Sequence, residues 1–408
     1  MIWPYLIVWA CVRQDLVTRN KMSLVENQLR RDLDALKAAD LYRSRRVVET
    51  VQGCYVQVEG RKLLNFCSND YLGLARHPDV ITRFKLAADQ YGVGSGSAHL
   101  VCGHSAEHHA LEEELAEFTG RDKALLFSTG YMANVGVIAG LMSKGDVIYE
   151  DKLNHASLLD GGLLSGARFS RYLHNDVDNL SLKMQRHESG QSMIVTDGVF
   201  SMDGDVAKIA ELSDIAQQKS AYLMVDDAHG LGVLGETGAG IVEQLQLNQK
   251  QVPLLVGTFG KALGTSGAFV AGSNELIETL IQKARTYIYT TALPPAVAAA
   301  TRCSLSLLQT EAWRRVQLAE LIAYFKQASE QLNLPLMPSD TAIQPLVVGS
   351  SQQALAASES LFEQGLWVGA IRPPTVPQGS ARLRITLSAE HTKTEIDQLL
   401  SALECLSL

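Results

Sequence analysis

The feature that most constrains the fold of this sequence is the alternation of short apolar runs with helix-like stretches between about residues 105 and 290. The apolar runs have the length of strands, and segments with helical periodicity, such as Ala133–Met142 and Ile209–Lys219, separate most of them. Strands that are joined through helices run parallel in one sheet. We therefore predict an α/β fold with a mostly parallel sheet, whose strands are Ala124–Phe127, Val147–Glu150, Met193–Asp197, Tyr222–Asp227, Leu254–Gly257 and Ala268–Ala271.

The regions on either side of this sheet differ from it in pattern. Residues 22–68 are expected to form an N-terminal arm, amphipathic from Ser23 to Arg46, followed by a hairpin. Residues 69–295 are expected to form a large domain that ends near two adjacent prolines. A smaller C-terminal α+β domain follows over residues 296–408, beginning with a long helical pattern and ending in an amphipathic helix, Thr392–Leu406.

The first residues form an apolar run from Met1 to Val12. Twelve helical residues span about 18 Å, which is short of the ~30 Å hydrocarbon core of a bilayer. No Lys or Arg precedes the run, as a secretory signal would require. Because Met22 is followed by a clean amphipathic pattern, we interpret residues 1–21 as an upstream extension and expect no membrane contact.

Charge and cysteine content exclude several classes of protein. The 36 basic and 44 acidic residues give a net charge of −8, and no basic tract stands out, so we expect no nucleic-acid partner. The six cysteines are scattered and include no CxxC pair. This pattern argues against a disulfide framework or a structural zinc site and favours a reducing cytoplasm.

Polar residues follow two of the predicted strands directly. Asp226 ends one apolar run, and Thr258 and Lys261 follow the next in the segment Gly257–Gly264. In open α/β sheets, ligands bind beyond the carboxyl ends of the strands. Each residue also has an ordinary interpretation, the aspartate as a helix cap and the lysine as solvated surface.

Three further segments place polar groups at strand ends. A strand, a tight turn at Gly130 and a helix beginning near Tyr131 would present N–H groups that can bind phosphate. His155 and Ser201 each follow another strand, although a single histidine is more often structural. Together these residues suit pyridoxal 5′-phosphate (PLP), because its aldehyde needs a lysine and its pyridine nitrogen needs a carboxylate.

Two other motifs suggest different chemistry. Gly230, Gly232 and Gly235 match the dinucleotide pattern GxGxxG, but after Glu243 the next acidic residue is Glu275, so a nucleotide-binding oxidoreductase is a remote alternative. Three histidines lie near the start of an acidic helix, at positions 104, 108 and 109. The first two could form a metal pair, but HExxH is absent, so we interpret them as a solvated helix face and expect no metal site.

The segments Asp226–Gly230 (DDAHG) and Thr258–Lys261 (TFGK) resemble the α-oxoamine synthases, a family of fold-type-I PLP-dependent transferases. The resemblance extends from about Ser23 to the end of the chain. It implies a large domain with the mostly parallel sheet, a smaller C-terminal domain and the N-terminal arm. The stretches NFCSNDYLGL, TDGVFSMDGD and AIRPPTVP, which begin at Asn65, Thr196 and Ala370, favour the branch that serves biotin biosynthesis.

That branch implies a decarboxylative condensation of L-alanine with a pimeloyl thioester, carried on CoA or on acyl carrier protein. The alternative within the family is glycine or serine with a different acyl-CoA. The resemblance also implies that Lys261 holds PLP and removes the Cα proton, that Asp226 pairs with the pyridinium and that His155 stacks on the ring. The other implied contacts to cofactor oxygens are those of Gly130, Tyr131, Ser201, His229 and Thr258.

Arg372 is the expected partner of the amino-acid carboxylate, because a guanidinium can hold a carboxylate at two points. The resemblance adds further substrate contacts, from Arg43, Asn69, His155 and Thr375.

Three segments bear on how far the family pattern extends. Position 197 is Asp where the family usually has Glu, and Gly94–His99 departs from the usual loop, so no role is assigned to that loop. Tyr289–Thr291 resembles the segment through which a partner subunit reaches the cofactor phosphate. We therefore expect a homodimer with composite active sites.

Overall fold

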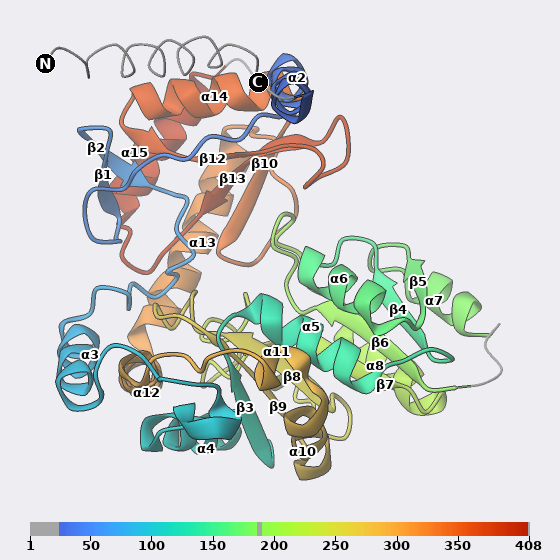
Figure 1. Ribbon diagram of the computed structural model, residues 1–408. Helices are drawn as coiled ribbons and strands as arrows, with labels where there is room; N and C mark the ends of the chain where they lie inside the picture. The colour runs from blue at the N-terminus through green and yellow to red at the C-terminus, as the bar shows by residue number, and fades with distance from the viewer. Residues whose placement is uncertain (1–23, 186–189, 407–408) are drawn as a thin grey trace, which may run out of the picture.

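A seven-stranded sheet forms the centre of the larger part of the protein (Figure 1), in a computed structural model that describes residues 24–185 and 190–406. The predicted extension at residues 1–21 lies outside the described residues. The strand order is β3-β9-β8-β7-β6-β4-β5, and every neighbouring pair is parallel except those of β9. The strands are β3 (Lys123–Phe127), β4 (Val147–Asp151), β5 (Arg168–Tyr172), β6 (Ser192–Asp197), β7 (Tyr222–Asp226), β8 (Leu254–Thr258) and β9 (Ala268–Gly272).

The mostly parallel sheet is confirmed, with two differences. The edge strand β5 was not predicted, because its sequence RFSRY alternates polar and apolar residues and only Tyr172 is fully buried. The strand β9 runs antiparallel to both β3 and β8, so β3 and β8 point the same way. As a result, the carboxyl ends of β3, β4, β6, β7 and β8 all lie at one edge.

Helices cover both faces of the sheet, and alternate residues of the central strands pack against each face. Met224 and Val256 belong to a core shared with α5 and α10, whereas Val225 and Leu255 belong to a core shared with α7 and α8. Burial on both faces requires continuously apolar strands, which is why these strands were visible in the sequence. The helices of this part are α5 (Gly130–Leu141), α6 (Ala156–Ser165), α7 (Val177–Met184), α8 (Ile209–Gln218), α9 (Ile241–Gln244), α10 (Asn274–Lys283) and α11 (Arg285–Ile288).

Long helices join this part to the C-terminal part. The helical pattern predicted after residue 295 forms two helices, α12 (Pro295–Thr310) and α13 (Trp313–Gln331), and α13 runs upward between the two parts in Figure 1. Beside α12 lie α3 (Pro78–Tyr91) and α4 (Ala106–Phe118), while the short helix η2 (His99–Gly103) contacts α11.

The expected solvated histidine face at the start of α4 is wrong for His108. That side chain is fully buried, its Nδ1 accepts from the Ser105 backbone N–H at 3.0 Å, and its Nε2–H donates to the Leu293 carbonyl at 2.7 Å. It therefore joins the start of α4 to the segment before α12.

Two small sheets lie in the C-terminal part and the N-terminal region. Strands β10 (Ile343–Gly349), β13 (Ala381–Thr386) and β12 (Gly369–Ile371) form an antiparallel sheet, flanked by α14 (Ser351–Glu363) and α15 (Lys393–Glu404). The predicted hairpin is β1 (Tyr55–Val58) and β2 (Arg61–Asn65), and β11 (Leu366–Trp367) extends it.

The N-terminal arm begins with α2 (Leu24–Ala38), which ends well before the predicted limit of its amphipathic pattern and buries none of its side chains. The domain limits at residues 22, 69 and 296 stay predictions. Within the described ranges, no helix has both the length and the apolar character that a bilayer span needs.

Candidate active site

The sheet brings the residues predicted from strand ends together at one edge. Asp226 is the last residue of β7, Thr258 is the last residue of β8, and Asp197 ends β6 directly opposite Asp226 in the parallel register. Lys261 lies three residues beyond β8, and Gly130 begins the helix that follows β3. The common direction of these strands is sufficient to gather a carboxylate, a hydroxyl, an amine and a helix start in one place.

Asp226 is held by two hydrogen bonds. The Asn134 side-chain N–H donates to its Oδ2 at 2.6 Å, and the Ala228 backbone N–H donates to its Oδ1 at 3.1 Å. Asp226 is 6% exposed, and Asn134, on α5, is 1% exposed. The carboxylate is therefore fixed in direction before any ligand binds.

His155 is connected to Asp226 through two intermediate side chains. Asn134 also donates to Ser157 Oγ at 2.9 Å, so that hydroxyl can donate to His155 Nδ1, which lies 2.7 Å away. The Ser157 backbone N–H points at the same Nδ1 at 3.3 Å. With Nδ1 accepting, the ring proton is on Nε2. Burial lowers the pKa of His155, although the Asp226 carboxylate opposes this, so the ring is neutral near pH 7.

Asp197 fixes the start of α6. Its Oδ2 accepts from the His155 backbone N–H at 2.7 Å, and its own backbone N–H donates to Asn154 Oδ1 at 3.2 Å. Burial and the adjacent Asp226 carboxylate raise the pKa of Asp197 well above its usual range. Asp197, which is shorter than the Glu usual at this position, thus binds the backbone N–H of His155.

Lys261 is an amine with a strongly altered titration. Burial lowers its pKa to about 8, although the Asp226 and Asp197 carboxylates oppose the effect, and the Arg384 guanidinium adds to it. A lysine whose pKa is about 8 exists partly as the free amine near neutral pH, and the free amine is the form that can act as a nucleophile or base.

The start of α5 offers N–H groups beside Thr258. Thr129 caps the helix by accepting from the Met132 N–H at 3.1 Å, which leaves the first N–H groups, at Gly130 and Tyr131, without intrahelical partners. A Cβ built on Gly130 would lie 3.9 Å from Thr258 Oγ1. The Thr258 hydroxyl donates to the Gly267 carbonyl at 3.0 Å, and it would have to exchange this bond to donate to a ligand oxygen.

His229 belongs to a buried polar chain that ends at Arg384. Its Nδ1 lies 2.6 Å from the Tyr71 hydroxyl, which is 3.3 Å from Asn69 Oδ1. The Asn69 oxygen also accepts from Nη1 and Nη2 of Arg384, at 3.2 and 3.1 Å. Arg384 Nε donates to the carbonyl of Ser201 at 2.6 Å, and the guanidinium is 8% exposed. Burial, with the Lys261 and Arg384 charges, lowers the pKa of His229 well below its usual range.

The other predicted substrate residues form a second group. Arg372 donates from Nη1 to the Asp40 carbonyl and from Nη2 to the Tyr42 carbonyl, the latter at 3.2 Å. Arg43 Nη2 lies 3.5 Å from Thr375 Oγ1. These contacts join the N-terminal arm to the loop between β12 and β13. We call Arg43, Arg372 and Thr375 the arm group.

His174 links two of the loops that carry site residues. Its Nδ1 lies 3.0 Å from Asp151 Oδ1 and its Nε2 lies 2.8 Å from Asp205 Oδ2. Burial alone would lower the pKa of His174, but the hydrogen bonds to the two carboxylates outweigh it and raise the pKa to about 10. A charged imidazolium therefore joins the loop before His155 to the loop after Ser201.

Asn134, Arg384 and His174 were missed in the sequence. Asn134 lies inside an apolar helix, where it looked like an exception to the pattern. Arg384 lies in the sequence ARLRIT, which becomes the fully buried strand β13, so a buried arginine was the available signal. His174 follows the strand that was not predicted.

The GxGxxG segment has a structural role around Asp227. The Asp227 side chain accepts from the Ile241 N–H at 2.7 Å, and a Cβ on Gly230 or Gly240 would lie 2.1 or 1.9 Å from its oxygens. The glycines thus admit a buried carboxyl group, and the segment does not lead into a helix as a dinucleotide site requires.

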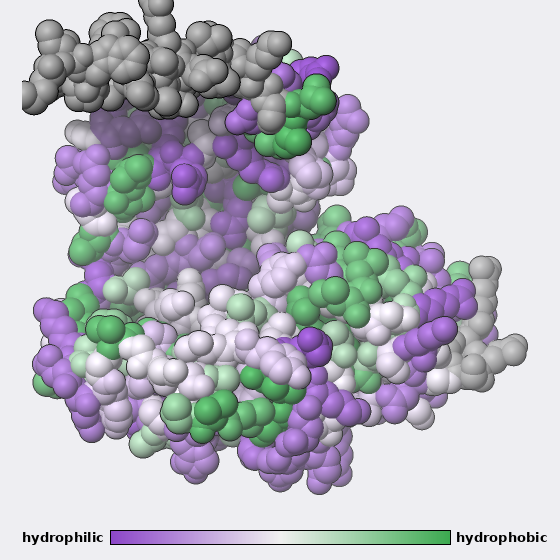
Figure 2. All heavy atoms as spheres, in the orientation of Figure 1, coloured by the Kyte–Doolittle hydropathy of each residue, from purple (hydrophilic) through white to green (hydrophobic). Residues whose placement is uncertain are grey.

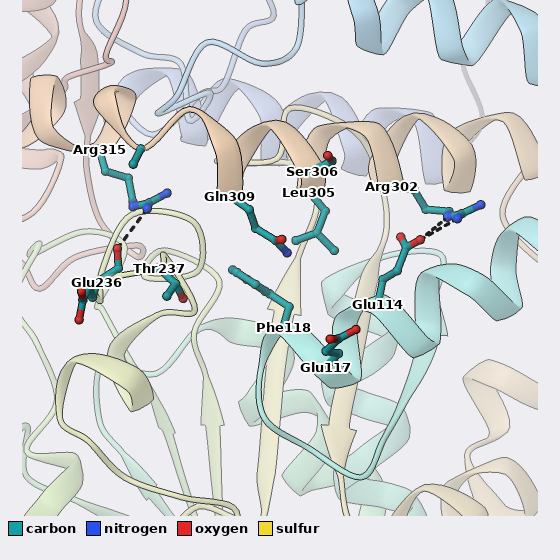
Figure 3. A pocket seen from close by; sticks show the side chains of 11 residues that line it. Glu114, Glu117, Phe118, Glu236, Thr237, Arg302, Leu305, Ser306, Gln309 and Arg315 are labelled. Atoms are coloured by element: carbon teal, nitrogen blue, oxygen red, sulfur yellow. Dashed lines mark hydrogen bonds and ion pairs between the residues drawn. The ribbon is translucent and has the colours of Figure 1, made fainter.

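A cavity of about 640 Å³ lies away from these strand ends, between α4, α12 and the loop after β7 (Figure 3). Arg302 pairs with Glu114 at 2.6 Å, and Arg315 donates to the Glu236 carbonyl at 3.1 Å. Both cations are therefore occupied by protein groups, and the cavity holds none of the predicted site residues.

The strand-end residues fit PLP. Asp226 can hold a proton on a pyridine nitrogen, Lys261 supplies an amine of lowered pKa, and the start of α5 can bind a phosphate. His155 is only partly buried, so its ring remains available to a flat ligand. The fold and these residues define a PLP-dependent transferase of fold type I.

The comparisons with known proteins agree with this class. Residues 61–403 match the family model for aminotransferases of class I and II. A protein from Saccharophagus degradans named 8-amino-7-oxononanoate synthase is 60% identical over 94% of this chain and 96% of its own length.

Solved structures extend the likeness to the fold. A serine palmitoyltransferase variant from S. paucimobilis with bound PLP–myriocin has a TM-score of 0.89 at 30% identity, covering 95% of this chain and 98% of that one. An 8-amino-7-oxononanoate synthase from Francisella tularensis has a TM-score of 0.73 at 32% identity, covering 84% and 97%. The chain belongs to the 8-amino-7-oxononanoate synthase family, within the class I and II aminotransferases.

Proposed function

We propose that this enzyme condenses L-alanine with a pimeloyl thioester and releases CO2 and the free thiol, to give 8-amino-7-oxononanoate for biotin synthesis. The observation that carries the proposal is the pair of half-buried Lys261 and buried Asp226 at neighbouring strand ends, in a chain 60% identical to a protein named for that product. Net charge and fold alone would suit many transferases, whereas this pair is needed for chemistry at an amino-acid Cα.

The residues that would hold PLP lie at or just beyond the strand ends, and with the side chains that position them we call them the strand-end group: Gly130, Tyr131, Asn134, His155, Ser157, Ser201, Asp226, His229, Thr258 and Lys261. Asp226 keeps the pyridine nitrogen protonated, His155 covers one ring face, and the N–H groups of Gly130 and Tyr131 hold the phosphate. Ser201, His229 and Thr258 are proposed contacts to its oxygens. Bound PLP supplies an aldehyde that takes up amines and a protonated ring that withdraws electrons.

Lys261 is proposed to move the proton at the alanine Cα. Its Nζ takes the proton as the free amine, and a pKa of about 8 makes that form accessible at neutral pH. The Asn134 side-chain N–H donates to Asp226 Oδ2 at 2.6 Å, and this hydrogen bond keeps the carboxylate aligned. The neutral ring of His155 adds no charge beside the amine.

Arg384 and the arm group lie in different places, and we propose that each binds a different substrate. Both Nη atoms of Arg384 donate to the single oxygen Asn69 Oδ1, and the same pair of donors can hold the two oxygens of a carboxylate. We propose Arg384, with Asn69, as the partner of the alanine carboxylate, since its charge already acts on Lys261. Arg372, first assigned that role, is proposed with Arg43 and Thr375 to contact the pimeloyl group and the product.

A homodimer in the cytoplasm is proposed as the working form. Aliphatic side chains are exposed on η2 and α6, and Figure 2 shows an apolar patch over α6, where Leu163 and Leu164 are 67% and 68% exposed. Tyr289, in the segment expected to reach the partner's cofactor, is 70% exposed. All five cysteines within the described residues are free, which suits a reducing compartment.

The test is product formation by the purified enzyme with PLP. Incubation with pimeloyl-CoA and L-alanine labelled with 13C at the carboxyl carbon should release one labelled CO2 per 8-amino-7-oxononanoate, measured by mass spectrometry. Glycine and L-serine, in parallel, should give little product. If serine or glycine reacts faster than alanine, the substrate assignment is wrong.

A further inference from the structure

We propose that His104, His109 and Glu112 form a binding site for a divalent transition metal of the zinc class at the start of α4, which departs from the expectation of no metal. Each residue offers one ligand atom, and these atoms all lie within 4.8 Å of one another. Two imidazoles and one carboxylate are a ligand set that zinc uses with a water as the fourth ligand. The proposal does not depend on the proposed reaction.

The hydrogen bonds select these three ligands from a larger cluster. His99, His104 and His108 also lie close together, but both ring nitrogens of His108 are engaged, by Ser105 and by the Leu293 carbonyl. His108 can therefore bind a metal only by giving up the bonds that hold the start of α4. His104 Nε2 faces Glu112 at 3.9 Å, which is beyond hydrogen-bond distance, so it can bind a metal without giving up a hydrogen bond to that residue.

The two inner ligands are oriented by groups behind them. His104 Nδ1 lies 3.0 Å from His99 Nδ1, so a proton on His104 Nδ1 leaves its Nε2 lone pair directed at Glu112. The His99 ring is itself stacked on Tyr287, with ring centroids 5.0 Å apart. Metal-binding histidines usually donate their second N–H to an acceptor in this manner.

Glu112 is held from the opposite side. Its Oε1 accepts from the Leu126 backbone N–H of β3 at 3.0 Å, which leaves Oε2 facing His104 Nε2 at 3.9 Å. That separation is too long for a hydrogen bond. Two ligand atoms bound at about 2.0–2.1 Å in a tetrahedral site lie about 3.4 Å apart, so a small rotation would close the site.

His109 completes the site from the solvent side. Its ring lies edge-on to that of His104, with centroids 5.7 Å apart, and its side chain is 64% exposed, against 29% for His104 and 11% for Glu112. A metal would thus enter from solvent beside His109. It would tie the loop at His104 to α4, and that loop is already paired with the chain before α12 through Ala98 and Thr291.

The test is a titration of tag-free holoenzyme, stripped of metals by a chelator, with Zn2+ alone against a chromophoric zinc indicator. We expect one Zn2+ per protomer and a rise in Tm with zinc concentration. His104→Gln and Glu112→Gln should each weaken binding by about tenfold or more. Glu117→Gln on the same helix and Cys102→Ser in the adjacent short helix η2 should bind as the wild type does.

The exposed His109→Gln variant keeps the test decisive if a variant of an inner ligand fails to fold. It should also weaken binding, and Co2+ absorption should report a four-coordinate site in the wild type. Absence of stoichiometric zinc would overturn the proposal. So would binding that survives in His109→Gln and in either inner variant, or binding that is lost in Cys102→Ser.

Discussion

The strand-end group and the arm group differ in how firmly the structure holds them. Asp226, Asn134, Ser157 and His155 are linked by contacts of 2.6 to 2.9 Å, and three of the four residues are buried. In the arm group, Arg43 and Thr375 are exposed, and their one mutual contact is 3.5 Å long. The groups that we propose to carry the chemistry are thus pre-organised, and pre-organisation lowers the cost of reaching a transition state.

The arm group teaches a complementary point. Arg372 holds backbone carbonyls of a segment that follows α2, a helix with no buried side chain. A substrate that binds there exchanges protein contacts for its own, so its affinity depends on the arm as well as on the pocket. We infer that the strand ends determine the reaction and that the arm adjusts which acyl group enters.

The largest effect is expected from a substitution in the strand-end group. Asp226→Asn removes the negative charge that holds the pyridine proton, and we expect kcat to fall by at least about 10²-fold with the fold retained. Steady-state turnover and circular dichroism measure the two properties. Asp214→Asn, on the exposed side of α8, is the matched control. Near-normal turnover in Asp226→Asn would mean that the carboxylate has another role.

The next-largest effect distinguishes the proposed role of Arg384 from that of Arg372 in the arm group. Arg384→Lys keeps the charge but loses the two-point grip, and we expect the KM for alanine to rise about 10- to 100-fold, because a charge-assisted hydrogen bond contributes about 1.5–3 kcal/mol. Arg372→Lys should change the KM for the acyl thioester more than that for alanine. If Arg372→Lys alone raises the alanine KM, the original assignment from the sequence is correct and the division proposed above is not.

Asn134 provides a smaller test of the pre-organised link. Asn134→Ala leaves both catalytic groups in place but breaks the hydrogen bonds to Asp226 and Ser157. We expect kcat to fall about tenfold, since a lost hydrogen bond costs about 1–2 kcal/mol. Asn134→Asp, which lacks the N–H donors, should be at least as damaging, whereas a merely space-filling role predicts that it is milder.

The smallest effect concerns stability and its dependence on pH. The folded pKa of His174, about 10, lies above an unfolded value of about 6.5, so its stabilisation is complete below pH 6.5 and is lost as pH rises toward 10. His174→Gln should lower the free energy of unfolding by about 1–3 kcal/mol at pH 6 and by less at pH 9. Urea unfolding at both pH values measures this, and an equal loss at both would contradict a charged His174.

The sequence was most informative where a site residue directly follows a strand that is apolar throughout. The continuous apolar runs revealed the central strands, and the motifs after them located Asp226, Thr258 and Lys261. Arg384 and Asn134 depend instead on long-range packing: β13 reaches Ser201 across 183 positions, and Asn134 reaches Asp226 across 92. No local pattern encodes such contacts. The interpretation of residues 1–21 as an upstream extension stays a prediction.

The histidines at α4 show the same limit. Their spacing favoured a solvated face, because a sequence cannot show that Leu293, 185 positions away, accepts from His108. Burial of that one ring changes which neighbours are available as ligands. The cluster of histidines could therefore be recognised in the sequence, but which of them are free to bind a metal could be seen only in the structure.

The most direct test of the central claim is exchange of the alanine Cα hydrogen with D2O, followed by NMR in the absence of an acyl donor. The wild-type holoenzyme should exchange it, and the rate should rise about tenfold between pH 7 and 9, as an amine with a pKa of about 8 loses its proton. Lys261→Ala should abolish the exchange, while Lys283→Ala on α10 should not. Exchange at the wild-type rate in Lys261→Ala would contradict the account.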